Sequence, residues 1–184
     1  AERLKFWERI LAHSREDFLI DIEAEAAIAM AITTNEAQRI VSHHDFDGVA
    51  KNIDDIFKVI VEAFAPDIVK IAVTANDVTD AISVWKLIEQ AHEANNKMIP
   101  IAMGDAGKWT RILGLAHGAF LTYASFDAAG ETAPGQVNAR ELLQLYRVKQ
   151  LDRDTKVHGI LGDPVSQSLS TFMHNPAFAS VGFN

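Results

Sequence analysis

The stretch Asp67-Ile-Val-Lys-Ile-Ala-Val73 is a short apolar run, rich in β-branched residues, that a single lysine interrupts. Successive side chains of a strand point to opposite faces. One face would carry Val69, Ile71 and Val73, and the other Ile68, Lys70 and Ala72. The first face suits packing against helices, and the second would point the lysine into the interior of a closed sheet. The stretch therefore predicts a buried strand at Ile68–Val73.

Further apolar runs of similar length lie on both sides of this stretch. They predict strands at Phe18–Ile22, Arg39–Ser42, Met98–Met103 and Phe120–Tyr123. Helical patterns separate the later strands. One helical face would carry Ile53, Ile56, Phe57, Ile60, Val61 and Phe64, and another Val78, Ala81, Ile82, Trp85 and Ile88. Strands that alternate with amphipathic helices predict a parallel α/β sheet.

Two asparagines indicate where helices begin. Asn76 precedes the second of these helical patterns and is expected to cap it. Asn138 with Glu141 has the spacing of a capping box, which predicts the start of a third helix.

Polar residues occupy alternate positions of several expected strands, namely Asp21 and Glu23, Ser42 and His44, and Lys70. In a doubly wound sheet both faces are dry, whereas inward positions near the C-terminal end of a (β/α)8 barrel can be polar and catalytic. We therefore expect a partial (β/α)8 barrel. The five strands would be its last five βα units, and the first three strands would be missing.

The composition is ordinary for a globular protein, with 48% hydrophobic and 23% charged residues among 184. No apolar run approaches the roughly 20 residues that span a bilayer, and residues 1–17 lack the pattern of a signal peptide. The sequence starts at Ala1 inside one helical pattern and stops at Asn184 just after another. We therefore expect both ends to be cuts in a longer chain.

Charge and cysteine content exclude several classes of function. The absence of cysteine rules out disulfides, zinc ribbons and thiolate catalysis, and is compatible with a cytoplasmic protein. The net charge is −8 and no Lys/Arg run is clustered, which argues against a nucleic-acid binder. We expect a small-molecule substrate, with neither nucleic acid nor a membrane as partner.

Lys70 is the strongest indication of chemistry. A lysine among β-branched residues of a strand is costly unless it is paired, because burial disfavours its charge. The same burial would lower the pKa of the amine and free it as a nucleophile toward a ketone. The alternative is a solvent-exposed lysine on an edge strand, which the residues alone leave open.

His44 lies in Val41-Ser-His-His-Asp-Phe46, at the C-terminal end of an expected strand, where barrel catalysis takes place. A histidine can transfer protons near neutral pH. The alternative is a loop histidine that bonds a backbone group. His43 would point to the opposite face and is expected to be structural. Because adjacent strand residues diverge and no third ligand is suitably spaced, we expect no metal site.

Arg111 and a downstream loop are further candidates. Arg111 follows the loop Met103-Gly-Asp-Ala-Gly107, and its guanidinium could hold a carboxylate bidentately; a surface arginine is the alternative. The glycine spacing of that loop does not match a nucleotide-binding fingerprint. The segment Thr132-Ala-Pro-Gly-Gln136 contains a Pro-Gly turn, and its hydroxyl and amide could close over a polyol. Taken alone, it would pass as an ordinary loop.

Taken together and in order, these pieces resemble the motifs of type I 3-dehydroquinate dehydratases. The motifs are His-His-Asp-Phe at 43–46, Val-Lys-Ile-Ala-Val at 69–73, Ala-Met-Gly-Asp-Ala-Gly at 102–107 with Arg-Ile-Leu-Gly at 111–114, Leu-Thr-Tyr-Ala at 121–124 and Thr-Ala-Pro-Gly-Gln at 132–136. The resemblance covers about residues 1–149. It implies a (β/α)8 barrel and the dehydration of 3-dehydroquinate to 3-dehydroshikimate, a lyase reaction that needs no cofactor.

The resemblance also implies roles for individual residues. Lys70 matches the Schiff-base lysine, and His44 matches the general acid/base. The other matches are Arg111 to the arginine that binds the substrate carboxylate, Met103 to an active-site methionine, Thr132 and Gln136 to a loop that closes over the substrate, and Asp21 and Glu23 to acidic residues of the fourth strand.

The end of the chain has a second resemblance. A strand is expected at Val157–Leu161, and the Gly-Asp-Pro-Val and Ser-x-Ser segments that follow, with Met173-His-Asn175, resemble the opening of shikimate dehydrogenase. Ser168 and Ser170 match a pair of hydroxyls that hold the carboxylate of shikimate.

The two resemblances divide the chain into a dehydratase barrel at 1–149, a polar linker at 150–156 and the start of a shikimate dehydrogenase substrate-binding domain at 157–184. In this order they imply a bifunctional enzyme of the shikimate pathway, which supplies chorismate and the aromatic amino acids. NADP would serve the complete dehydrogenase domain, whose binding site would lie beyond Asn184. Because substrate contacts from the first three strands would be missing, we expect the 184-residue chain alone to be inactive.

Two other functions would also account for Lys70. Another Schiff-base barrel enzyme, such as an aldolase, would share the strand lysine but not the Thr-Ala-Pro-Gly-Gln loop. A non-catalytic barrel fragment would form no covalent adduct at Lys70. Turnover of dehydroquinate against that of a sugar phosphate would separate the two enzymes.

Overall fold

A four-stranded parallel sheet organises the computed structural model, which describes residues 2–13, 19–23, 37–126, 133–162, 164–165 and 167–183. The strands are β1 (Leu19–Glu23), β2 (Gln38–Asp45), β3 (Ile68–Thr74) and β4 (Lys97–Met103). They lie side by side in sequence order, and each neighbouring pair is parallel. The predicted parallel α/β sheet is therefore confirmed.

Helices of different kinds precede, connect and follow the strands. The α-helices are α1 (Glu2–Leu11), α3 (Ile53–Phe64), α4 (Asp80–Glu93), α5 (Lys108–Leu113) and α6 (Ser170–Ser180). Two short 3₁₀ turns, η1 (Asp105–Gly107) and η2 (Gly114–His117), flank α5, and a π-helical turn, η3 (Glu141–Leu145), follows later.

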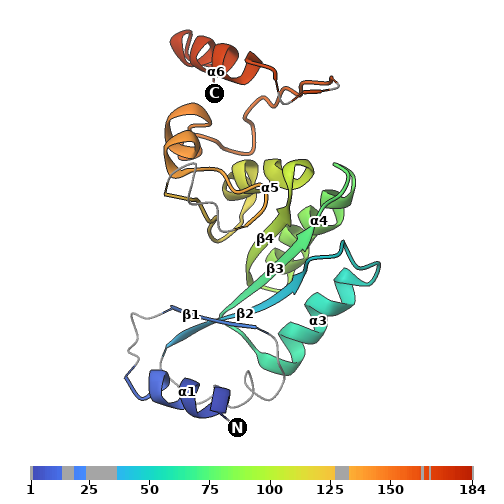
Figure 1. The fold of residues 1–184 in the computed structure, drawn as a ribbon, viewed down its shortest axis with the longest axis vertical. Coiled ribbons are helices and arrows are strands. Elements are labelled where there is room, and N and C mark those ends of the chain that lie inside the picture. Colours follow the sequence, from blue (N-terminus) through green and yellow to red (C-terminus); the bar gives the residue numbers. More distant parts are fainter. Residues whose placement is uncertain are drawn as a thin grey trace.

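One face of the sheet packs against α3 and α4, which lie on the same side of it (Figure 1). Val69, Ile71 and Val73 of β3 belong to this core, and all three side chains are completely buried. From the helices, the core receives Ile53, Phe57, Ile60 and Phe64 of α3, and Ala81, Val84, Leu87 and Ala91 of α4. This is the helix-packing face that the alternation of residues 67–73 predicts.

The opposite face of the sheet carries a smaller apolar cluster. Its buried members are Ile40, Ile68, Ala72, Ile99, Ile101 and Met103, and Leu121 and Tyr123 pack against it. This inner face, as we call it from here on, is the face on which Lys70 was expected. The apolar cluster covers only part of the inner face, and the polar side chains described below lie on the same face.

Arg39 of β2 ties the sheet to the end of α3. Its guanidinium donates to the carbonyl oxygens of Phe64 at 3.4 Å and Ala65 at 2.7 Å. Its backbone N–H donates to the Asp67 carboxylate at 2.7 Å. A cation at the C-terminus of a helix compensates the carbonyl groups that have no partner within the helix. This contact fixes the turn that leads directly into β3.

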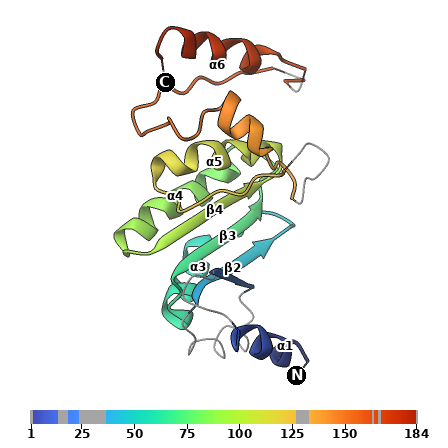
Figure 2. The ribbon, with the colours of Figure 1, turned by 90° about the vertical axis from the view of Figure 1, so that its left-hand side faces the viewer.

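The two ends of the chain lie far from each other. Figures 1 and 2 show α1 at one end of the molecule and α6 at the other, with the sheet between them. No residue of α6 is buried, and Leu161 ahead of it is 99% exposed. In the part of the chain that the structure describes, no helix has the length and apolar character that crossing a membrane requires.

Two of the predicted strands are wrong. Phe120–Tyr123 is irregular rather than a strand: Phe120 N donates to Met98 O at 2.8 Å, and the segment forms no ladder with β4. Val157–Leu161 is also irregular. A strand requires a partner that pairs its backbone groups, and among the described residues neither segment has one. The described sheet thus contains four of the five expected strands.

One of the two predicted caps is also wrong. Asn76 lies ahead of α4, and its backbone N–H, like that of Asp77, donates to the Asp80 carboxylate at the start of the helix. The prediction for the third helix is confirmed in part, because the Asn138 side-chain oxygen accepts from Glu141 N at 2.9 Å. That bond is one half of a capping box.

Candidate active site

Strand register gathers five polar side chains on the inner face. In β1 and β2, Glu23 lies beside Ser42; in β2 and β3, Ser42 lies beside Lys70. Residues paired across parallel strands point to the same face, and so do residues two apart on one strand. Asp21 and Glu23 of β1, Ser42 and His44 of β2, and Lys70 of β3 therefore form one constellation, which we call the inner-face cluster.

Lys70 is held in this cluster by an ion pair. Its Nζ lies 2.5 Å from Asp21 Oδ2, and its side chain is only 12% exposed. The ring of Tyr123 lies beneath the ammonium group, with 5.0 Å between Nζ and the ring centroid. The lysine is therefore largely buried and paired, not exposed on a sheet edge. Lys70 lies within β3, and its amine reaches Asp21 and Tyr123 on the inner face.

Asp21 contacts several of the other side chains on the inner face. One carboxylate oxygen accepts from Lys70, and the other accepts a short hydrogen bond from the Ser42 hydroxyl. Burial raises the pKa of Tyr123 above its usual value, and the charge of Asp21 and a hydrogen bond to it add to the shift. Three residues on three different segments thus converge on one carboxylate.

His44 lies at the end of β2 and faces Glu23. Its Nδ1 is 3.4 Å from Glu23 Oε1, and its ring stacks on Phe46 with the centroids 6.0 Å apart. Burial and then the charge of Lys70 lower the pKa of His44 below 6.5, while Glu23 and Asp21 act in the opposite direction. The imidazole is therefore neutral near pH 7 and can accept a proton.

The opposing effects of Lys70 and Glu23 on His44 give a testable pair of substitutions. Lys70→Met should raise the pKa of His44, because it removes a positive charge that disfavours the imidazolium. Glu23→Gln should lower it, by a smaller amount since Glu23 is 62% exposed. NMR titration of the His44 ring in the full-length gene product, assigned by its loss in His44→Asn, measures both signs. Two shifts in the same direction would contradict the geometry.

His43 lies on the other face of β2. It pairs with Ile71, a member of the helix-packing core, whereas His44 pairs with Ala72 of the inner face. The predicted divergence of the two histidines is confirmed. Among the described residues, no group of three or more His, Cys, Asp or Glu side chains is arranged to hold a metal ion.

The end of β4 positions Met103 and Arg111. Met103 is buried in the inner-face apolar cluster and pairs with Thr74 of β3. The Thr110 hydroxyl donates to Gly107 O at 2.8 Å and accepts from Ala102 N at 3.2 Å, which fixes α5 against the strand. Arg111 follows at once and is 2% exposed, so it is not a surface arginine.

The loop that carries Gln136 lies against the same strand end. Gly104 N donates to Pro134 O at 3.0 Å, and Gln136 is 8% exposed. Gly135 has φ +71°, and a Cβ there would lie 2.3 Å from Gly104 O, so only glycine fits. Thr132 lies outside the described residues. Although Gln136 is far from Met103 in sequence, its loop is thus brought to the β4 end of the sheet, where Met103 lies.

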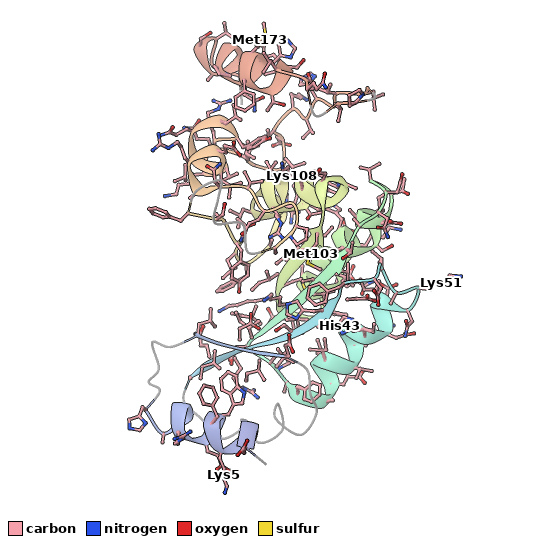
Figure 3. All side chains as sticks on the ribbon, viewed as in Figure 1. Lys5, His43, Lys51, Met103, Lys108 and Met173 are labelled. Atoms are coloured by element: carbon pink, nitrogen blue, oxygen red, sulfur yellow. The ribbon has the colours of Figure 1, made fainter. Side chains whose placement is uncertain are left out.

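Ser168 and Ser170 lie apart from the inner-face cluster. Their hydroxyls are hydrogen-bonded to each other at 2.9 Å, at the start of α6. Figure 3 shows Met173 of α6 at the far end of the molecule from Met103 and His43, which lie at the sheet. The two serines are therefore not part of the site on the sheet.

Sequence reasoning gave no role to two residues that the structure brings into the cluster. Tyr123 is part of the Leu-Thr-Tyr-Ala motif but was expected only as a strand residue. The sequence identifies Ser42 only as a polar residue at an alternate position of a strand. The signal for Ser42 was its place two residues before His44, which puts both on one face; nothing in the sequence indicated its bond to Asp21.

Comparison with known sequences identifies 3-dehydroquinate dehydratases among the relatives of this chain. The profile of the family described as type I 3-dehydroquinase matches residues 1–153. The chain is 35% identical over 165 residues to "Bifunctional 3-dehydroquinate dehydratase/shikimate dehydrogenase, chloroplastic" of Arabidopsis thaliana, which covers 90% of this chain and 26% of that protein. It is 32% identical to a 3-dehydroquinate dehydratase of Methanococcus maripaludis, covering 80% of this chain and 67% of that one. The chain thus spans about a quarter of the plant relative and two thirds of the archaeal one.

Solved structures of the same kind share the fold. The 3-dehydroquinate dehydratase of Aquifex aeolicus superposes with a TM-score of 0.62 and 28% identity, over 81% of this chain and 66% of that one. The enzyme from Geobacillus kaustophilus gives a TM-score of 0.60 and 27% identity, over 72% and 53%. With the family profile covering most of the 184 residues, the chain belongs to the type I 3-dehydroquinase family.

Proposed function

We propose that the protein of which these residues are part dehydrates 3-dehydroquinate to 3-dehydroshikimate through a Schiff base at Lys70. One observation carries the proposal: in a chain of this family, a largely buried lysine amine lies on the inner face of the sheet, with a histidine on the same face of the adjacent strand. An amine supplies the covalent chemistry and an imidazole supplies the proton transfers. No cofactor is needed for either.

The proposed reaction assigns a step to each residue. The Lys70 amine adds to the substrate ketone and water leaves, which forms an iminium ion. The iminium withdraws electrons, so His44 can remove a proton from the adjacent carbon and leave an enamine. The enamine then expels the hydroxyl group one carbon further on, and the His44 imidazolium donates the proton that makes it water. Hydrolysis of the remaining imine releases product and restores the amine.

The remaining candidates would hold the substrate. Arg111 would bind its carboxylate bidentately. Gln136, with Thr132, would contact its hydroxyl groups from the loop at the β4 end, and Met103 would line the floor. Asp21 and Glu23 would keep Lys70 and His44 in place. These assignments rest on family membership together with the buried positions of Arg111, Gln136 and Met103.

We further propose that the chain is part of a partial (β/α)8 barrel joined to shikimate dehydrogenase. In this division residues 1–149 belong to the barrel, 150–156 are a linker and 157–184 begin the second domain. The plant relative supports this, since its printed name includes both activities and 90% of this chain aligns with it. Ser168 and Ser170 would then bind shikimate, and NADP would bind to a part of the dehydrogenase that these residues do not include.

Turnover assays test the proposal directly. The full-length gene product should convert 3-dehydroquinate to 3-dehydroshikimate, seen as the rise in ultraviolet absorbance of the conjugated product, and should not cleave a sugar phosphate. The 184-residue chain alone should be nearly inactive, because four described strands cannot enclose a substrate. Aldol cleavage without dehydration would favour an aldolase-like enzyme. A full-length product that turns over neither substrate would favour a non-catalytic barrel.

A further inference from the structure

Ser42 is the one member of the inner-face cluster to which the proposed function assigns no role. Its hydroxyl donates a short hydrogen bond to Asp21 Oδ1 and lies 3.2 Å from the carbonyl oxygen of Ile22. The residue is 1% exposed, so the hydroxyl is shielded from water. Both acceptors belong to β1, while the serine itself belongs to β2.

The Ser42 hydroxyl contacts one of the two oxygens of the Asp21 carboxylate. A serine hydroxyl has one proton to donate, and the charged carboxylate of Asp21 is a stronger acceptor than the carbonyl of Ile22. The two oxygens of Asp21 then have different partners. Oδ1 accepts from the Ser42 hydroxyl, and Oδ2 accepts from Lys70 Nζ at 2.5 Å. The Asp21 side chain is 34% exposed, so packing alone does not fix it. Besides Lys70 and Tyr123, the nearly fully buried Ser42 holds this carboxylate through a hydrogen bond.

We propose that Ser42 is a positioning residue, which holds Asp21 so that its second oxygen keeps the Lys70 amine directed at the substrate ketone. The inference rests on the proposed function and adds to it a residue that acts through another. Ser42 does not touch the substrate; it donates to a carboxylate, and the carboxylate orients the nucleophile. Loss of the Ser42 hydroxyl would let the Asp21 side chain rotate and would slow imine formation. The adduct at Lys70 would still form.

The matched pair Ser42→Thr and Ser42→Val isolates the hydroxyl. Both variants add the same bulk to a buried position, and they differ only in the hydrogen-bond donor. The readout is the rate of adduct formation at Lys70 in the full-length gene product, measured by quenching dehydroquinate reactions with borohydride at successive times. The final adduct yield is measured in the same series, because partial misfolding lowers the yield whereas misplacement of Asp21 lowers the rate.

Ser42→Val should form the adduct roughly 10–100-fold more slowly than Ser42→Thr, the range that one hydrogen bond to a charged group accounts for. Both should reach the same final yield. Equal rates for the pair would overturn the inference. If the wild-type protein forms no adduct at all, the proposed function fails and the inference with it, which is a different outcome from equal rates.

A double-substitution cycle gives a second measurement that does not depend on threonine fitting the site. Ser42→Ala should slow adduct formation in the wild-type background but cost nothing further once Asp21→Asn is present, because Ser42 acts only through that carboxylate. Additive losses would show that Ser42 matters for another reason, such as packing between β1 and β2, and would also overturn the inference.

Discussion

Replacing Lys70 by methionine should abolish dehydration of 3-dehydroquinate by the full-length gene product. Methionine keeps most of the length and apolar contacts of the side chain but cannot form an imine. Removing the covalent nucleophile of a hydrolase costs on the order of 10⁶ in kcat, and we expect a loss of at least roughly 10⁴ here. The inner face would lose the amine that pairs with Asp21 at 2.5 Å, while the packing of β3 would be retained.

Borohydride trapping separates this covalent role from a merely electrostatic one. In the wild-type protein, borohydride with substrate should add the mass of the reduced adduct to the peptide that contains Lys70. Lys58→Met is the matched control, since Lys58 is exposed on α3 and should be neither labelled nor needed. Labelling at Lys58 or at the exposed Lys86 of α4, with normal activity in Lys70→Met, would contradict the assignment.

The strands around Lys70 could be predicted because two-residue alternation is a local property. The apolar run at 67–73 indicates both the strand and the face on which the lysine lies, and the structure confirms both. The end of β2 was harder to predict. The strand continues to Asp45 through polar residues, because register with β3 pairs His44 with Ala72 and Asp45 with Val73. An apolar run alone cannot reveal pairing of that kind.

The wrong strands show the limit of the same reasoning. Phe120–Tyr123 has the composition of a strand, but Leu121 and Tyr123 instead pack over the inner face while Phe120 makes one backbone bond to β4. Whether an apolar run pairs its backbone as a strand or only packs its side chains depends on what lies next to it in space. Val157–Leu161 is similar: its composition suits a strand, and among the described residues no strand lies beside it to pair its backbone.

The site was predictable one residue at a time but not as a network. Lys70 could be selected because burial within a strand makes an amine chemically useful, and His44 because it lies near the end of a strand. That Asp21 joins Lys70, Ser42 and Tyr123 depends on the stagger of three strands and on the path of the segment after η2. Such convergence of distant residues follows from register, which a single sequence does not specify.

His44→Ala should lower kcat by roughly 10²–10⁴, the usual contribution of a general acid/base. His43→Ala should change kcat far less, because His43 pairs with Ile71 on the helix-packing face and cannot reach the Lys70 amine from there. Both residues are histidines, but their side chains point to opposite faces of the sheet. Each substitution is therefore the control for the other. Steady-state assays on both variants of the full-length gene product give the ranking, and the reverse ranking would show that His43 is the acid/base.

Trapping experiments on His44→Ala should also distinguish it from Lys70→Met. In the proposed mechanism, imine formation needs the amine and its orientation by Asp21, and His44→Ala changes neither residue. The step it removes is the later proton abstraction, so substrate should accumulate as an adduct that borohydride can reduce, even though product forms slowly. If His44→Ala instead formed no adduct and Lys70 remained reactive to other ketones, His44 would be required for addition to the ketone. Its assigned role would then have to move to the first step of the reaction.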